Sequence, residues 1–275
     1  MPKRAACAGL LLAGLLGLAG GAAAAASLQL DDLTWTEVRE GLRAGTTTVI
    51  IPVGGTEQNG PHMALGKHNV RAAALSARVA AKLGHTLVAP VMPYVPEGRI
   101  SPPAGHMRFP GTISVPEDAF AAVLAGAARS LKQHGFLDVV LIGDSGNYQR
   151  QLKDIAARLN REWAGTGARA HYVAAYYDAA TTDFAQALRA RGITQRQIGT
   201  HAGIADTSLL MAIDESRVRA DRLAAPGAAD PSSGVTGEPS QSTAALGRIG
   251  VDMIIDKTAA AIRLAIAGRK PASKE

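Results

Sequence analysis

Side chains able to do chemistry follow directly after an apolar, β-branched segment near the start of this sequence. Residues 47–53 (TTVIIPV) have the length and composition of a buried parallel strand. The chain then turns polar and glycine-rich, and this stretch carries Glu57, Asn59, His62 and His68. Loops that leave the carboxyl ends of strands form the ligand crevice of open α/β sheets, so these four side chains are expected to face a site.

The same pattern recurs twice further along the chain. Asp144 follows the apolar run 136–142, and the glycine-containing turn 201–206 carries His201 and Asp206. Strand ends of one parallel sheet converge on one edge, so these loops are expected to meet the first one. Carboxylates and imidazoles gathered there are typical of a hydrolytic metal site, in which a divalent ion acidifies water and polarises a carbonyl. Asp144 and Asp206 also have a simpler reading as caps of the helices that follow them.

The elements that must position these groups alternate between strands and helices. Residues 93–115, rich in proline and glycine, are expected to form a long ordered loop over the site. The alternation predicts one α/β domain over residues 27–268, with three layers and a mostly parallel sheet flanked by helices. Strands are predicted at 47–53, 86–92, 136–142 and 168–177, and helices at 34–45, 69–84, 116–135, 148–163, 182–191, 207–213 and 243–267.

The first 26 residues have the layout of a secretory signal peptide. Lys3 and Arg4 precede an Ala/Leu-rich stretch, and small residues lead up to Ser27, so cleavage is expected near Ala26. A retained membrane anchor is the alternative, but the apolar stretch is short and interrupted by glycine. The protein is therefore expected to be exported, periplasmic or secreted, with a polar tail at 269–275 and no membrane association after cleavage.

Charge and cysteine content restrict the possible partners and metal ligands. Loss of Lys3 and Arg4 with the leader lowers the formal net charge from +6 to +4. The remaining basic residues are scattered, so a nucleic-acid partner is not expected. The single cysteine, Cys7, also leaves with the leader. A metal would then have to be bound by histidine, carboxylate or amide side chains.

Five sequence blocks, in order, cover nearly all of the expected mature chain and resemble the creatininase family of metal-dependent amidohydrolases. The family form P-x-G-x-x-E-Q-H-G-P-H-L is matched at 52–63, and a histidine three residues before F-P-G-T-x-S is matched by His106 and 109–114. The other blocks fall at 134–136 with 143–147, at 201–208, and at 234–239.

The resemblance implies a set of site residues, and this chain departs from the family at most of them. The family's ligand positions are occupied here by Glu57, Asn59, His68, Asp144 and Asp206, of which only Glu57 keeps the family's residue type. We interpret Glu57, His68, Asp144 and Asp206 as the ligands of a remodelled site for zinc or manganese, with one or two ions per chain. Asn59 is a weak ligand for such ions. The resemblance further implies that His201 shuttles a proton to the leaving nitrogen, and that Asn59, His62 and His106 belong to a second metal site or support the first.

The implied activity is hydrolysis of an amide or lactam bond in a small molecule, by a protein that forms homo-oligomers, often hexamers. Two alternatives remain open. The first is a secreted binding protein on the same scaffold with a degraded metal site. The second is a serine esterase, because Gly143, Asp144 and Ser145 follow an apolar strand and His201 could act as a base.

Overall fold

The structure is a computed structural model that describes residues 27–223 and 231–268. The expected leader (1–26) and polar tail (269–275) lie outside the described residues. Within the described part of the chain, no helix combines the length and the apolar character needed to cross a bilayer.

Four parallel strands form a central sheet in the order β2–β1–β3–β4. The two central strands are buried along their whole length, as their β-branched and aliphatic residues predict. Their register pairs Val53 with Gly143, so the loops that follow these two strands start side by side. The bounds are β1 Thr48–Val53, β2 Thr86–Val88, β3 Asp138–Gly143 and β4 Arg169–Tyr172.

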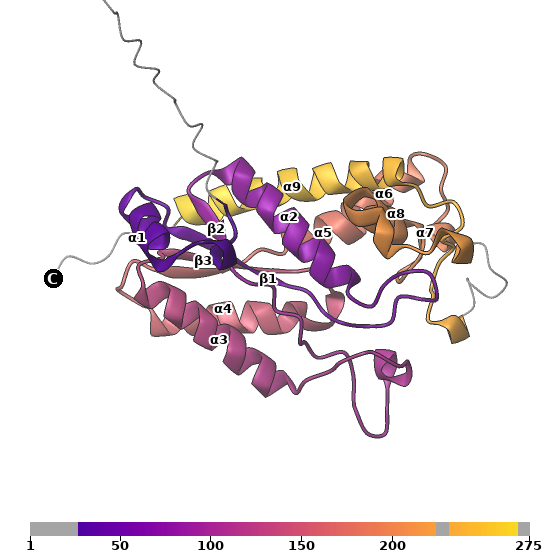
Figure 1. The fold of residues 1–275 in the computed structure, drawn as a ribbon, viewed down its shortest axis with the longest axis horizontal. Coiled ribbons are helices and arrows are strands. Elements are labelled where there is room, and N and C mark those ends of the chain that lie inside the picture. Colours follow the sequence, from indigo (N-terminus) through magenta and orange to yellow (C-terminus); the bar gives the residue numbers. More distant parts are fainter. Residues whose placement is uncertain (1–26, 224–230, 269–275) are drawn as a thin grey trace, which may run out of the picture.

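Helices cover both faces of this sheet, which confirms the predicted three-layer α/β fold (Figure 1). Alternate residues of β1 enter different cores: Val49 and Ile51 pack with α3 and α4, whereas Ile50 packs with α2 and α9. The helices on the first face are α3 (Glu117–Gln133) and α4 (Gln149–Glu162). Those on the second are α2 (Lys67–Leu83), α5 (Ala175–Asp178), α6 (Phe184–Arg189), α8 (Ile204–Asp214) and α9 (Ala244–Ala267).

Several element bounds differ from the prediction. The strand predicted at 168–177 ends at Tyr172, and a continuous helical segment of α5, a π-turn (Ala179–Asp183) and α6 follows. The alanines of this segment favour a helix, which also buries Tyr176 in the second core. The strand predicted at 86–92 ends at Val88, and beyond it Met92 forms an isolated bridge with Val53 of β1. Two short helices lie at the ends of the molecule: α1 (Trp35–Arg43), as predicted, and α7 (Gln195–Ile198), which was not.

Two site residues sit on helices rather than in loops. Helix α2 begins at Lys67, so His68 lies in its first turn, and Asp206 lies in the first turn of α8. The loop from 93 to 115 contains only the short 3₁₀ turn Gly105–Arg108, which carries His106 to the edge of the sheet. Side chains of helices, strand ends and this loop therefore meet at one edge.

Candidate active site

Glu57 is the centre of the site at the carboxyl edge of the sheet. Its side chain is 2 % exposed and lies among three imidazoles. Glu57 Oε1 is 2.7 Å from His68 Nε2 and 3.8 Å from His201 Nδ1, and Oε2 is 3.3 Å from His106 Nε2. Burial opposes the charge of Glu57, but His68, Lys67 and His201 outweigh it and hold the pKa of this carboxyl far below its usual range.

His68 connects Glu57 to a second buried carboxylate. Its Nδ1 is 2.5 Å from Asp144 Oδ1, and the Tyr176 hydroxyl donates to Asp144 Oδ2 at 2.7 Å. Burial and nearby Lys67 disfavour a charged ring, yet the carboxylates of Glu57 and Asp144 prevail and raise the pKa of His68. A protonated ring donates from both nitrogens, which matches the two carboxylates that face it.

Two cations on α2 complete this network. Lys67 Nζ lies 3.2 Å from Asp206 Oδ2, and Arg71 Nη1 lies 2.7 Å from Asp206 Oδ1. Arg71 Nε is also 3.2 Å from Asp144 Oδ1. The four residues predicted as metal ligands are thus brought together, but three of them, His68, Asp144 and Asp206, are engaged by one another or by Lys67 and Arg71.

His106 and His201 form the open side of the site, and Gln58 orients both rings. The Gln58 side-chain amide lies 3.0 Å from His106 Nδ1 and 3.1 Å from His201 Nε2. The Gln58 main-chain oxygen is 3.0 Å from His201 Nε2, so a proton on that nitrogen leaves the lone pair of Nδ1 facing Glu57. Burial lowers the pKa of His201 to about 4 and also lowers the pKa of His106, so both rings are neutral near pH 7.

The structure places Asn59 and His62 away from this open side. The amide nitrogen of Asn59 donates to the main-chain oxygens of Glu57 at 2.9 Å and Ala64 at 3.2 Å, which braces the loop. His62 is buried against α8, with Nε2 3.0 Å from Thr207 Oγ1. Burial also lowers the pKa of His62 to about 4.

A cavity of about 580 Å³ opens beside His106. Its wall contains a buried acidic residue, Glu97, that was not predicted from the sequence. Glu97 accepts a hydrogen bond from Asn147 Nδ2 at 2.6 Å. Burial, with the charge of Glu57 next, raises the pKa of Glu97 to about 8, so this carboxyl is protonated near pH 7. A side-chain hydrogen bond between Glu97 and Glu57 adds to this shift, and Glu57 Oε2 and Glu97 Oε1 are buried atoms that have no other hydrogen-bond partner.

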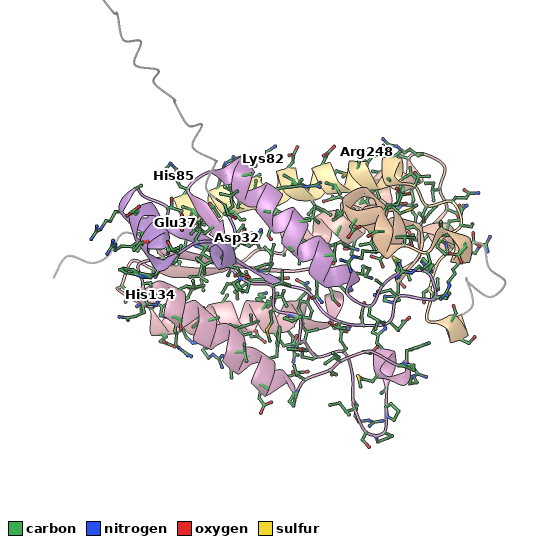
Figure 2. All side chains as sticks on the ribbon, viewed as in Figure 1. Asp32, Glu37, Lys82, His85, His134 and Arg248 are labelled. Carbon is green, nitrogen blue, oxygen red and sulfur yellow. The ribbon has the colours of Figure 1, made fainter. Side chains whose placement is uncertain are left out.

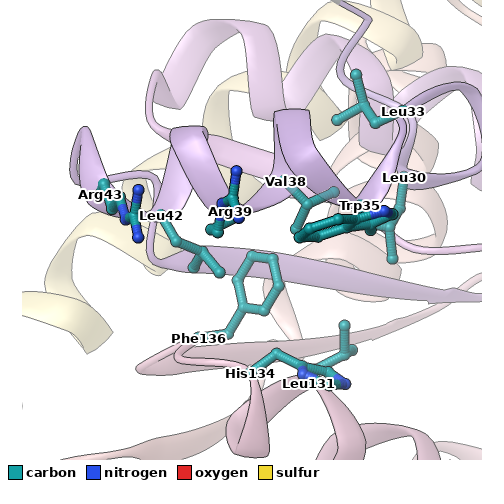
Figure 3. Close-up of a pocket in the computed structure, with 10 residues that line it drawn as sticks. All are labelled: Leu30, Leu33, Trp35, Val38, Arg39, Leu42, Arg43, Leu131, His134 and Phe136. Carbon is teal, nitrogen blue, oxygen red and sulfur yellow. The ribbon is translucent and has the colours of Figure 1, made fainter.

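A second cavity, of about 650 Å³, lies under α1 and has a different chemistry (Figure 3). Leu42 and Phe136 belong to its apolar lining, Arg39 and Arg43 supply its positive charge, and no carboxylate lines it. Figure 2 places His134 and His85 at this end of the molecule, away from α7 and α8. The cavity beside His106, by contrast, is lined by this imidazole and by the carboxyl groups of Glu97 and Glu117.

The esterase alternative requires Ser145 and His201 to be neighbours. Ser145 Oγ accepts a hydrogen bond from the Asn147 main chain at 3.4 Å, whereas the His201 ring bonds to Gln58. Asp144, which would precede the nucleophile, is held by His68 and Tyr176. The structure does not form a serine–histidine pair here.

Sequence reasoning missed Gln58, Lys67, Arg71 and Glu97. For the two cations the sequence did contain a signal. Lys67 and Arg71 are four residues apart, so they lie on the same face of the helix. The same spacing continues to Leu75 and Val79, and all four residues form the buried stripe of α2. Charges on an apolar stripe indicate buried partners. Glu97 lies in a loop without periodicity, where no pattern marks a side chain as buried.

Comparison with known proteins identifies the class. The family described as creatininase, creatinine amidohydrolase, matches residues 31–262. Creatinine amidohydrolase of Pseudomonas putida is 30 % identical over 203 residues, which are 72 % of this chain and 76 % of that protein. A mycofactocin precursor peptide peptidase of Mycobacterium ulcerans is 28 % identical over 234 residues, covering 76 % and 82 % of the two chains. A solved structure of manganese creatininase superposes with a TM-score of 0.71 at 26 % identity, over 88 % of this chain and 99 % of that one.

This chain belongs to the creatininase family of metal-dependent amidohydrolases. Among its described residues, one group could hold an ion: Glu57, His106 and His201, whose ligand atoms all lie within 4.8 Å of one another. One carboxylate and two neutral imidazoles form a donor set that suits zinc and leaves room for water or substrate. In the structure the Gln58 amide faces His106 Nδ1 and His106 Nε2 faces Glu57, so metal binding through Nε2 would require the tautomer with its proton on Nδ1.

Proposed function

We propose that this chain is an exported hydrolase that cleaves a C–N bond of a small amide or lactam with the help of one divalent ion, zinc or manganese. The observation that carries the proposal is the position of Glu57 between His106 and His201, beside a cavity of about 580 Å³. When bound, the ion supplies the Lewis acidity that polarises a carbonyl and lowers the pKa of water.

The residues of the chain divide the remaining work between them. Glu57, His106 and His201 would hold the ion, and Gln58 contacts both rings, through its side-chain amide and its main-chain oxygen. The cavity beside His106 receives the substrate; its polar side chains offer hydrogen bonds to a small amide. These are Glu97, Arg99, Ser114, Glu117 and Asn147.

His201 can serve either as a ligand or, as the family resemblance implies, as the proton shuttle. Its Nδ1 faces Glu57 and its Nε2 lies against the Gln58 main-chain oxygen, so the geometry favours the ligand role. A His201→Ala variant distinguishes the ligand role from the proton-shuttle role. Loss of the ion on dialysis supports the ligand role, whereas a retained ion with lost turnover supports the shuttle.

The test is hydrolysis by protein stripped with a chelator and reloaded with zinc or manganese. Release of amine is measured from creatinine, from an unsubstituted five-membered lactam and from a short peptide amide. Glu57→Gln is expected to lose both the ion and hydrolysis, while Glu117→Gln, an exposed glutamate at the cavity mouth, keeps the ion. A wild-type protein that takes up neither metal and hydrolyses none of the probes contradicts the proposal and favours a binding protein.

Self-association is part of the same proposal. The resemblance to the family supports a homo-oligomer, often a hexamer, and light scattering of the purified protein measures the mass directly. A mass equal to that of one chain contradicts this part of the proposal.

A further inference from the structure

Helix α2 carries two cations into the most buried part of the site. The side chains of Lys67 and Arg71 are 1 % and 2 % exposed. A buried charge is strongly unfavourable unless it is paired, so partners of opposite charge have to be near both groups.

Those partners are carboxylates at positions where the family resemblance implies metal ligands. Asp206 lies between the two cations, with Oδ2 facing Lys67 Nζ at 3.2 Å and Oδ1 facing Arg71 Nη1 at 2.7 Å. Both oxygens of this carboxylate are therefore occupied. Lys67 and Arg71 together hold the pKa of Asp206 well below its usual range, against the effect of burial.

The other two carboxylates are reached by the same helix. Arg71 Nε lies 3.2 Å from Asp144 Oδ1, and Lys67 Nζ lies 3.8 Å from Glu57 Oε1. His68, between Lys67 and Arg71 on α2, bridges Glu57 and Asp144. One turn of helix thus supplies a lysine, a histidine and an arginine to these three carboxylates.

We infer that Lys67 and Arg71 take the place of a bound metal ion, so that Asp144 and Asp206 bind no ion and the chain holds at most one. The position of that single ion, at Glu57, His106 and His201, rests on the proposed function; the replacement by Lys67 and Arg71 does not. A divalent ion and the two side chains would compete for the same carboxylate oxygens. The buried cluster is consequently stable without metal.

The experiment measures metal content per chain and thermal unfolding, with and without chelator, for wild type and Lys67→Met. The wild-type protein is expected to bind no more than one zinc or manganese ion per chain and to unfold at nearly the same temperature after chelation. Lys67→Met removes the ammonium but keeps most of the side-chain volume. The metal-free variant is expected to unfold at a lower temperature, to gain one ion per chain on adding metal, and to recover stability as the ion binds.

Lys82→Met is the matched control, because Lys82 lies on the same helix and pairs with Asp256 at 2.5 Å on the exposed surface. It should behave like wild type in both measurements. Two ions per wild-type chain, or a Lys67→Met protein no more responsive to metal than wild type, overturns the inference.

Asp206→Asn decides the question if Lys67→Met does not fold. It is expected to keep the wild-type metal content, because Asp206 holds cations of the protein and no ion; a lower metal content overturns the inference. A wild-type protein without ion or hydrolysis would refute the proposed function alone. Metal uptake by Lys67→Met would still support the replacement.

Discussion

Three imidazoles surround one carboxylate in this site, and their environments give them different roles. His68 lies between Glu57 and Asp144, which raise its pKa against the effect of burial. His106 and His201 are neutral because burial lowers their pKa. Metal binding requires a deprotonated nitrogen. At neutral pH His106 and His201 therefore suit an ion, whereas His68 suits a salt bridge.

A pair of histidine variants tests this division at the scale of single residues. His106→Ala removes a nitrogen 3.3 Å from Glu57 Oε2, whereas His62→Ala removes a buried ring that contacts Thr207. We expect His106→Ala to weaken zinc binding by more than the roughly 10–100-fold that loss of an outer partner causes. His62→Ala should lose stability but keep zinc affinity, as titration calorimetry would show. Equal zinc affinities for the two variants would place the ion elsewhere.

Glu97 gives a prediction about pH. Its pKa is about 8 in the folded protein, because of burial and of Glu57, against 4.5 as the ordinary value. Below about pH 4.5 the carboxyl is protonated in the folded and unfolded states, and above about pH 8 it is ionised in both. Between these limits unfolding releases a proton, so this group makes the free energy of unfolding fall as pH rises.

Glu97→Gln removes that dependence. With chelator present, the free energy of unfolding of the variant minus that of wild type is expected to increase from pH 5 to pH 8, by up to about 1.4 kcal/mol per pH unit. Taking the difference cancels the opposite contributions of His62 and His201, which keep their lowered pKa values. Urea unfolding at several pH values measures it, and a difference independent of pH would mean that Glu97 is ionised in the folded protein.

At the scale of elements, the loop before α9 determines the position of Gln58. Gly234 has φ of +82°, and a methyl group there would lie 2.0 Å from Gln58 Oε1. The Gln58 amide also donates to the Gly234 main-chain oxygen at 2.9 Å. The loop therefore helps to hold Gln58 beside His106 and His201.

Gly234→Ala is expected to displace Gln58 and weaken zinc binding at least tenfold, since Gln58 fixes both rings. Gly192→Ala is the control, because its φ of +83° imposes the same backbone strain of about 1–2 kcal/mol with open space around the new methyl group. Titration calorimetry and thermal unfolding of both variants separate strain from displacement. If Gly192→Ala loses as much zinc affinity as Gly234→Ala, the contact with Gln58 is not responsible.

The sequence predicted the elements better than it predicted their contacts. Buried strands such as 47–53 and 136–142 stand out by their β-branched composition, and the rule for parallel sheets brought the loops after them to one edge. The segment 168–177 was predicted wrongly beyond Tyr172, because a short apolar run with alanine and tyrosine fits a strand or a helix equally well. The charges of α2 were overlooked because long polar side chains usually lie on the exposed face.

At the scale of the whole molecule, the cavity beside His106 and the cavity under α1 differ in chemistry and in position. The first, lined by His106, Glu97 and Glu117, lies at the carboxyl edge of the sheet, and the second, largely apolar, lies under α1. One edge thus concentrates the buried charge while the aliphatic cores on both faces of the sheet hold the elements in position. Changes at the site are therefore expected to alter metal binding with the fold preserved.

Export is the prediction that concerns the whole chain. Expression with residues 1–26 in a bacterium is expected to give a periplasmic or secreted protein whose intact mass corresponds to residues 27–275, because small residues at Ala24 and Ala26 suit a signal-peptidase site. Replacing both by leucine should abolish cleavage after residue 26, whereas Ala25→Leu, between them, should not. Mass spectrometry of the periplasmic, culture-medium and membrane fractions tests all three proteins. A wild-type protein that keeps residues 1–26 and stays in the membrane fraction would instead show that this segment is a retained anchor.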